Sequence, residues 1–168
     1  QGALHFWRLA IKPGRPVVTG KQSPVVMRII EEKAREAGAP LIRAQDRVAV
    51  RRISQDFDGQ VLSVETADGG WPPFRLPLLG DFQLENCAIA IAALEWMRDT
   101  LGFALPQEAI RTGLEKTRWP GRCQVVRRHP VFMVDVAHNP AAARALGAFL
   151  RTFRNGRPVA LICGLLAD

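Results

Sequence analysis

Residues 131–142, VFMVDVAHNPAA, present three polar side chains where an apolar strand meets a helix. The first four residues are β-branched, aromatic or long and apolar, which predicts a short buried strand with Asp135 at its carboxyl end. Asn139 can cap the following helix, and Pro140 suits its first position. Ligands bind at such strand ends in open α/β sheets, and a helix N-terminus favours anions. The corner that carries Asp135 and His138 is therefore a candidate ligand site, unless these residues serve only as caps and turn formers.

The elements around this corner indicate a small α/β unit. CQVVRR precedes it and RPVALICG follows it, and both runs are typical of strands. With a helix from Pro140 to about Phe153 between strands, the order suggests a right-handed parallel crossover. The upstream stretch TRWPGR predicts a domain boundary, which divides the chain into residues 1–117 and 118–168.

The first of these parts alternates strands and helices. The sequence predicts, in order, a strand at 17–19, a helix over 23–37, a strand at PLIRA, a hairpin formed by RVAVRRIS and QVLSVETAD, a long helix within GDFQLENCAIAIAALEWMRDTLG, and a helix over 106–116. Leu84, Cys87, Ile91 and Leu94 share one face of the long helix, and Gly102 suits its end. These elements predict an α/β protein.

Composition excludes several classes of protein. Of the 168 residues, 48% are hydrophobic and 23% are charged, which is typical of a globular protein. No apolar run is long enough for a membrane span and no signal peptide is evident, so we expect a soluble cytoplasmic protein without a membrane partner. Three widely spaced cysteines favour neither a disulfide framework nor a zinc site, and no metal ligands are assigned.

The net charge of +7 is compatible with two kinds of partner. A nucleic acid would use this positive field, and so would a small anion such as a nucleotide or a polycarboxylate. The arginines are scattered along the chain, and no basic run is interleaved with aromatic residues as in single-strand binders. We therefore predict small-molecule substrates and no nucleic-acid partner.

Five motifs in order give the chain a specific resemblance. The segments are IKPGRPVVTG, LPLLGDFQLENCAIAIAAL, TRWPGRCQVV, VDVAHNPAAARAL and LICGLLAD. Together they resemble the folylpolyglutamate synthase and dihydrofolate synthase family of Mur-ligase-like, ATP-dependent amide ligases. The resemblance implies the latter part of a Mur-ligase-like central domain followed by the first part of a Rossmann-like C-terminal ligase domain.

The resemblance also implies an activity in folate biosynthesis and one-carbon metabolism. Members of this family add L-glutamate to a folate or to dihydropteroate through an acyl phosphate, with ATP and Mg²⁺ as cofactors. Charge neutralisation and domain closure are the main catalytic demands of such a reaction. The sequence leaves open whether folate or dihydropteroate is preferred, and the full-length relative is expected to be a monomer.

Four positions match functional residues of the family. Asn86 in QLEN matches an asparagine near the adenine, and Arg122 in WPGR matches an arginine directed at the nucleotide phosphates. Asp135 matches the aspartate on the ribose side, and His138 matches the catalytic histidine near the reacting groups. For Asn86 the alternative is an ordinary helix-surface residue, and for Arg122 a solvated side chain.

The sequence also departs from the family pattern. The family's glycine-lysine-serine or -threonine phosphate loop is not in this chain. The stretch FWRLA, residues 6–10, stands where the family has a magnesium-binding lysine, and Phe82 precedes Gln83 where relatives often have histidine. We therefore expect an internal fragment that is inactive as a ligase by itself. The alternative is a non-catalytic nucleotide-binding or interaction module derived from the same fold.

Overall fold

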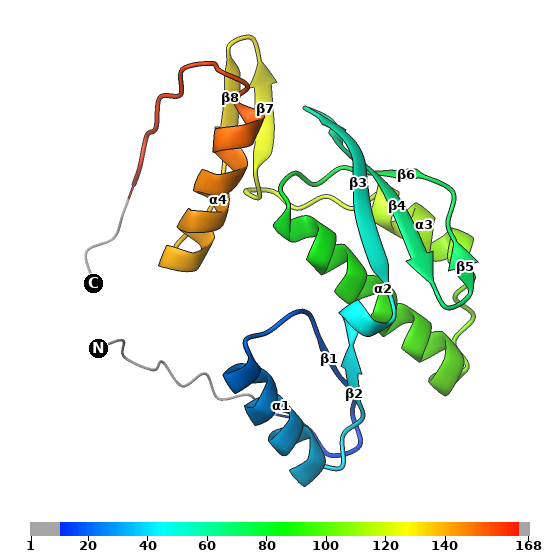
Figure 1. Cartoon of the computed structure of the whole chain (residues 1–168). Helices are drawn as coiled ribbons and strands as arrows, with labels where there is room; N and C mark the ends of the chain where they lie inside the picture. Colours follow the sequence, from blue (N-terminus) through cyan, green and yellow to red (C-terminus); the bar gives the residue numbers. More distant parts are fainter. Residues whose placement is uncertain (1–10, 165–168) are drawn as a thin grey trace.

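A computed structural model describes residues 11–164 of the chain. The FWRLA stretch, which stands where the family has a magnesium-binding lysine, and the last four residues of the LICGLLAD motif lie outside the described residues. The elements are β1 (Val17–Thr19), α1 (Pro24–Glu36), β2 (Leu41–Arg43), a 3₁₀ turn (Ala44–Asp46), β3 (Ala49–Asp56), β4 (Gly59–Thr66), β5 (Gly69–Gly70), β6 (Phe74–Leu76), α2 (Phe82–Leu101), α3 (Gln107–Glu115), β7 (Gln124–Arg128), β8 (Val131–Val134) and α4 (Pro140–Phe153) (Figure 1).

The first unit, β1–α1–β2, forms as its sequence predicts. Pro24 occupies the first turn of α1, and the Ser23 side chain accepts a hydrogen bond from the Val26 backbone N–H at 3.4 Å. After the helix the chain returns, and β2 pairs with β1 in parallel, with Val18 opposite Ile42. Capping and chain return are local features, which explains why sequence patterns found them.

A four-stranded antiparallel arrangement forms the centre of the molecule. The predicted hairpin is present, because β3 pairs with β4 from Ala49–Glu65 to Asp56–Gly59. Strands β5 and β6 both add to β4. Phe57 and Asp58 alone connect β3 to β4, and we call these two residues the hairpin tip.

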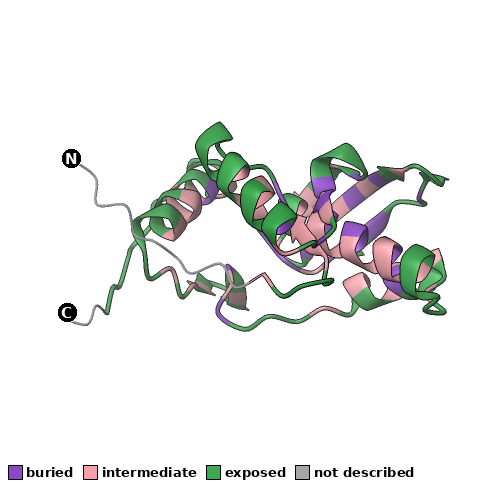
Figure 2. Ribbon diagram, turned by 90° about the horizontal axis from the view of Figure 1, so that it is seen from below, coloured by how far each residue is buried: buried purple, intermediate pink, exposed green. Residues whose placement is uncertain are grey.

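The long helix α2 packs against these strands and closes the main core. Cys87 and Ile91 are buried, and Leu84 and Leu94 pack against the core from its edge, so the predicted apolar face is confirmed. Figure 2 shows the buried positions where strands meet helices. The buried members of this core are Ile42, Ala44, Val48, Leu62, Val64, Trp71, Phe74, Leu76, Leu78, Cys87, Ala88, Ile91, Ala92 and Ile110.

A second, smaller core lies under α4. Its buried members are Leu79, Cys123 and Phe149, and side chains from α2, β7, β8 and α4 pack around them. Leu78 belongs to the main core and Leu79 to the second. The two cores thus meet within one short segment that precedes α2.

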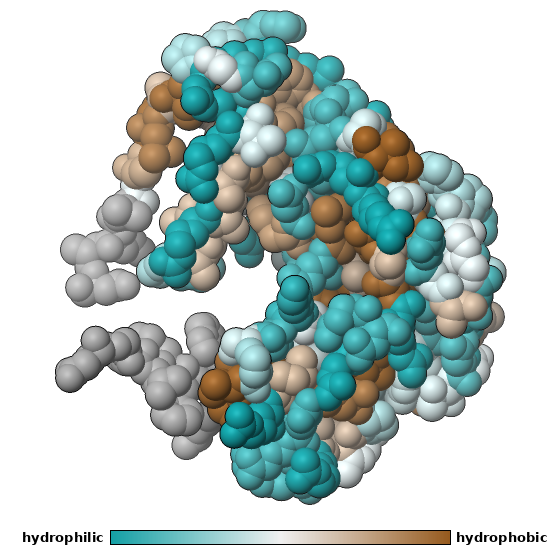
Figure 3. All heavy atoms as spheres, in the orientation of Figure 1, coloured by the Kyte–Doolittle hydropathy of each residue, from teal (hydrophilic) through white to brown (hydrophobic). Residues whose placement is uncertain are grey.

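The C-terminal elements differ from the prediction in two respects. Strands β7 and β8 form an antiparallel hairpin, and Phe132 on β8 is 48% exposed, so β8 is not the buried strand that its composition suggested. Within the described residues, 157–164 form no strand, so the predicted parallel crossover through α4 is wrong. Strand formation requires a partner edge, and the chain after α4 does not return to one. Figure 3 shows this apolar segment as a brown stretch beside α4.

Candidate functional site

The Asp135 carboxylate joins the end of β8 to the turn before β7. One oxygen, Oδ2, accepts hydrogen bonds from the Cys123 backbone N–H at 2.8 Å and from the Cys123 thiol at 3.4 Å. The other, Oδ1, accepts from the Ala137 backbone N–H at 2.8 Å. Both carboxylate oxygens therefore accept hydrogen bonds from the protein, and Asp135 links the end of β8 to the turn before β7.

A backbone bond reinforces this connection one residue further on. The Val136 N–H donates to the Gly121 carbonyl at 2.9 Å, and the Gly121 N–H donates to the Gln124 side-chain oxygen at 3.0 Å. Gly121 has a φ of +75°, and a Cβ atom there would lie 2.9 Å from a Val136 methyl carbon. Only glycine meets both requirements, so WPGR and VDVAHNP form one structural unit.

Cys123 lies inside this unit and is chemically quiet. Its side chain is 1% exposed. Burial, together with the adjacent Asp135 carboxylate, raises the pKa of the Cys123 thiol to about 12. A thiol in this state is neither a nucleophile nor a metal ligand at neutral pH, because both roles require the thiolate.

His138 and Asn139 differ in what they contact. His138 is exposed, and its Nδ1 lies 3.2 Å from the Val136 carbonyl oxygen, a contact that suits the tautomer protonated at Nδ1. The Asn139 side-chain oxygen accepts from the Ala142 N–H at 2.9 Å, which confirms it as the cap of α4. His138 therefore leaves Nε2 available to a ligand, whereas Asn139 serves its own helix.

Arg122 is half-buried in the turn that Asp135 holds. It lines a cleft of about 290 Å³ together with Arg118 and the exposed Trp119. The other lining residues come from the hairpin tip, from the segment before α2 and from the start of β7: Phe57, Asp58, Pro77, Leu78, Leu79, Pro120, Cys123, Gln124 and Val125. Two guanidinium groups at one cleft give a positive region at the junction of the two cores.

Asn86 lies on a different element, in the second turn of α2. It is exposed, and its side-chain N–H donates to the Gln83 side-chain oxygen at 2.9 Å. Phe82, one turn earlier, packs against the core that contains Cys123. The structure thus gathers Arg122, Asp135 and His138 at one corner and leaves Asn86 on α2, with no hydrogen bond to them among the described residues.

Sequence reasoning missed the contacts that join the hairpin tip to the C-terminal elements. The Phe57 and Phe153 rings meet edge to face at 5.3 Å, and the Arg157 guanidinium lies 5.7 Å from the centre of the Phe57 ring. Asp58 forms an ion pair with Arg128. These partners are about 70 or more residues apart in the chain, so no local pattern could have revealed them.

Two features are absent from residues 11–164. These residues hold no group of three histidine, cysteine, aspartate or glutamate side chains that could bind a metal ion. None of the helices in the same range combines the length and apolar character of a membrane span.

Sequence and structure comparisons agree on one group of proteins. Residues 121–168 match the family model of the Mur ligase glutamate ligase domain. The chain is 30% identical over 94% of its length to the dihydrofolate synthase/folylpolyglutamate synthase of Bacillus subtilis, and 32% identical over 94% to the folylpolyglutamate synthase of Lacticaseibacillus casei. It spans 37% of the length of each.

The solved structures give the same result at the level of the fold. A folylpolyglutamate synthase complex with AMPPCP and folate matches 94% of this chain with a TM-score of 0.85 and 31% identity, and the match covers 38% of that protein. The chain is homologous, over 94% of its length, to part of the folylpolyglutamate synthases and dihydrofolate synthases. Mycobacterium tuberculosis folylpolyglutamate synthase complexed with ADP matches 81% of the chain with a TM-score of 0.70 and 33% identity. The mixed α/β fold of this family, with its Mur-ligase-like C-terminal elements, was the fold class predicted.

Proposed function

We propose that the protein of which this chain forms part is an ATP-dependent ligase that adds L-glutamate to a folate or to dihydropteroate through an acyl phosphate. One observation carries the proposal: the chain follows the complex with AMPPCP and folate over nearly its whole described length. ATP supplies the phosphoryl group that activates the carboxylate. Mg²⁺ belongs to the same proposal, as the ion that neutralises negative charge on the phosphates.

Each candidate residue has a proposed role that suits its chemistry. Arg122 binds the nucleotide phosphates, since a planar guanidinium carries a permanent charge and several donors. Asn86 contacts the adenine, because an amide can both donate and accept. Asp135 fixes the corner and lies on the ribose side, and His138 stands near the reacting groups with Nε2 toward the ligand.

The domain arrangement is part of the proposal. Residues 1–117 belong to the central ATP-binding domain and residues 118–168 to the C-terminal ligase domain, which closes over the nucleotide. The two cores support this division, although Leu79 packs into the second one. We place the protein in the cytoplasm as a monomer, with small-molecule substrates and neither nucleic acid nor membrane as a partner.

A kinetic experiment on Arg122 tests the proposal. Residues 11–168 would replace the homologous segment of the Lacticaseibacillus casei enzyme, and ADP release would be measured against ATP, folate and glutamate. Arg122→Ala should raise the KM for ATP or lower kcat/KM by about tenfold or more, because a charge-assisted phosphate contact is lost. Arg127→Ala on β7 removes the same charge from an exposed position and should leave both within about twofold.

The non-catalytic alternative predicts a different result for the Arg122→Ala and Arg127→Ala chimeras. A module that binds nucleotide without catalysis gives a chimera with no glutamate-dependent ADP release in any form. The chain by itself should release no ADP with folate and glutamate, because phosphoryl transfer requires a phosphate-binding loop that is not in it. Glutamate-dependent turnover by the pure chain would contradict that expectation.

A further inference from the structure

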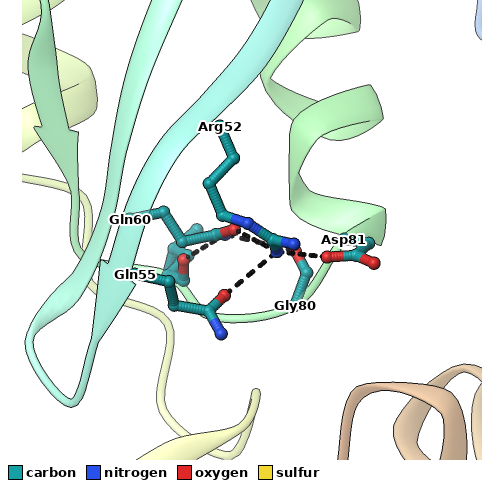
Figure 4. Close-up of polar contacts among 6 residues, drawn as sticks. Arg52, Gln55, Gln60, Gly80 and Asp81 are labelled. Atoms are coloured by element: carbon teal, nitrogen blue, oxygen red, sulfur yellow. Dashed lines mark hydrogen bonds and ion pairs between the residues drawn. The ribbon is translucent and has the colours of Figure 1, made fainter. Parts of the chain in front are cut away.

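A fully buried glutamine supports the start of α2. Gln60, the second residue of β4, is 0% exposed. Its side-chain N–H groups donate to the Leu78 carbonyl at 2.8 Å and to the Gly80 carbonyl at 3.2 Å (Figure 4). A buried amide that satisfies two backbone carbonyls fixes the position of that backbone, because leaving either carbonyl unpaired is costly.

Arg52 on β3 completes this arrangement. Its Nη1 donates to the Gln60 side-chain oxygen at 3.3 Å and to that of Gln55 at 3.2 Å, and it pairs with the Asp81 carboxylate (Figure 4). The Gln60 amide is thereby fixed in one orientation, with its oxygen toward the cation. Asp81 immediately precedes α2 and makes no capping bond of its own.

Close backbone packing accompanies these bonds. Gly59, next to Gln60, has a φ of +138°, and a Cβ atom there would lie 2.3 Å from the Leu76 carbonyl oxygen. Only glycine allows β4 to approach the segment before α2 so closely. The backbone of β4 at Gly59 and Gln60 is therefore held close to Leu76 and Pro77.

A chain of hydrogen bonds leads from Gln60 to Asn86. The Gly80 carbonyl that accepts from Gln60 also accepts from the Gln83 backbone N–H at 3.0 Å. The Gln83 side chain is 4% exposed, and its oxygen accepts from the Asn86 amide at 2.9 Å. Each of these hydrogen bonds has at least one buried partner. The orientation of the Asn86 side chain therefore depends on the position in which Gln60 holds the Gly80 carbonyl.

We infer that Gln60 is a positioning residue for the adenine side of the site, acting through Gly80 and Gln83 on Asn86. The inference rests on the proposed function, since it takes Asn86 as the group that meets the nucleotide. It adds a residue on β4 that lies outside every motif of the family resemblance. Gln60 itself does not touch the ligand.

The chimeric ligase described above allows a double-mutant test. Asn86→Ala and Gln60→Leu should each raise the KM for ATP, Gln60→Leu by about fivefold, on the order of the loss of one neutral hydrogen bond. Because Gln60 acts through Asn86, the double variant should be no worse than Asn86→Ala alone. The KM values for glutamate and folate should stay within about twofold in all three variants.

Two further variants separate positioning from folding. Gln60→Glu keeps the acceptor for Arg52 and removes both donors, so it should reproduce the rise in KM even if Gln60→Leu folds poorly. Gln55→Leu makes the same change at a glutamine that contacts Arg52 but not the segment before α2, and it should leave the KM for ATP unchanged.

The outcomes distinguish this inference from the function on which it rests. If Asn86→Ala raises the KM for ATP while Gln60→Glu lowers only the melting temperature, Gln60 is purely structural and the inference is wrong. Effects of Asn86→Ala and Gln60→Leu that multiply in the double variant would also overturn it. An unchanged KM in Asn86→Ala would instead remove Asn86 from the proposed nucleotide site.

Discussion

Replacing Asp135 by alanine should open the corner around Cys123. The Asp135 carboxylate accepts hydrogen bonds from the backbone N–H groups of Cys123 and Ala137, both at 2.8 Å. Without it, the Val136–Gly121 backbone bond, the pairing of β7 with β8 and apolar packing still hold the turn to the strand end, but the turn around Cys123 loses its side-chain acceptor. The Cys123 thiol, 1% exposed in the native protein, should then reach solvent more often.

The size of the effect follows from the two lost bonds to backbone N–H groups, since the third bond, from the Cys123 thiol at 3.4 Å, is weak. Hydrogen bonds to a charged acceptor contribute ~1.5–3 kcal/mol each, and ~1 kcal/mol each is the appropriate low estimate where water can replace the acceptor. Asp135 is half-buried, so water can reach part of the site after the substitution. A loss of ~2 kcal/mol corresponds to a local opening constant about 30-fold larger.

Thiol labelling with Ellman's reagent measures this opening directly. The three cysteines report on different regions: Cys163 is exposed, Cys87 lies in the main core and Cys123 in the corner. Burial raises the pKa of the Cys87 thiol to about 12, so Cys87 reacts only when the main core opens. Cys123 should label about 30-fold faster in Asp135→Ala, and Cys87 should be unaffected.

Two controls define what would refute this reasoning. Asp46→Ala removes an exposed carboxylate whose one ion pair among the described residues is with Arg43 at 3.9 Å, and it should leave Cys123 labelling unchanged. Asp135→Asn keeps one acceptor oxygen and should give an intermediate rate. If Cys123 labels within twofold of the native rate in Asp135→Ala, the carboxylate does not hold the corner and its bonds are incidental.

Three further predictions concern stability. Asn139→Ala should cost ~1 kcal/mol, seen as faster amide exchange in the first turn of α4, whereas Asn139→Asp should restore the cap; equal exchange in both variants would contradict this. Burial raises the pKa of the Glu95 carboxyl in the native state above its value in the unfolded chain. Between these two pKa values the native state binds more protons than the unfolded chain. The free energy of unfolding therefore falls as the pH rises through that window. Glu95→Gln should remove this slope, measured as urea midpoints at about pH 5 and about pH 7.5, and an unchanged slope would show that Glu95 is not its source. Phe57→Ala should lower the free energy of unfolding in urea by ~1–2 kcal/mol, because its ring packs edge to face on the Phe153 ring. Asp58→Ala breaks the exposed ion pair with Arg128 and should cost under about 1 kcal/mol. A larger loss in Asp58→Ala would show that the aromatic contact is not the main contact of the hairpin tip.

The features that the sequence predicted correctly depend on neighbouring residues. Ser23 and Asn139 cap their helices because each side chain reaches an N–H three residues ahead. Asp135 was placed correctly at the end of a strand. Its bonds to Cys123 were not predictable, because twelve residues and a hairpin separate the two.

The errors have a common physical origin in missing partners. Residues 158–163 have a strong strand composition, yet Leu161 and Ile162 are 71% and 87% exposed, and the described structure pairs them with no edge. The same reasoning applies to α1, where Val26 and Ile29 follow helical spacing but lie exposed. Periodicity identifies the face of an element that is apolar, and only tertiary structure decides what covers it.

The hairpin tip and the segment before α2 together explain how the two cores are joined. Leu78 and Leu79 are adjacent and pack into different cores, so a rotation of one core against the other must displace this segment. Gln60 holds the same segment from β4, and two residues before Gln60 the hairpin tip contacts β7 and α4. One hairpin thus contacts the C-terminal elements at its tip and the segment before α2 at Gln60, two residues beyond the tip. A change in the orientation of the C-terminal elements would therefore displace the segment before α2, which Gln60 holds from β4.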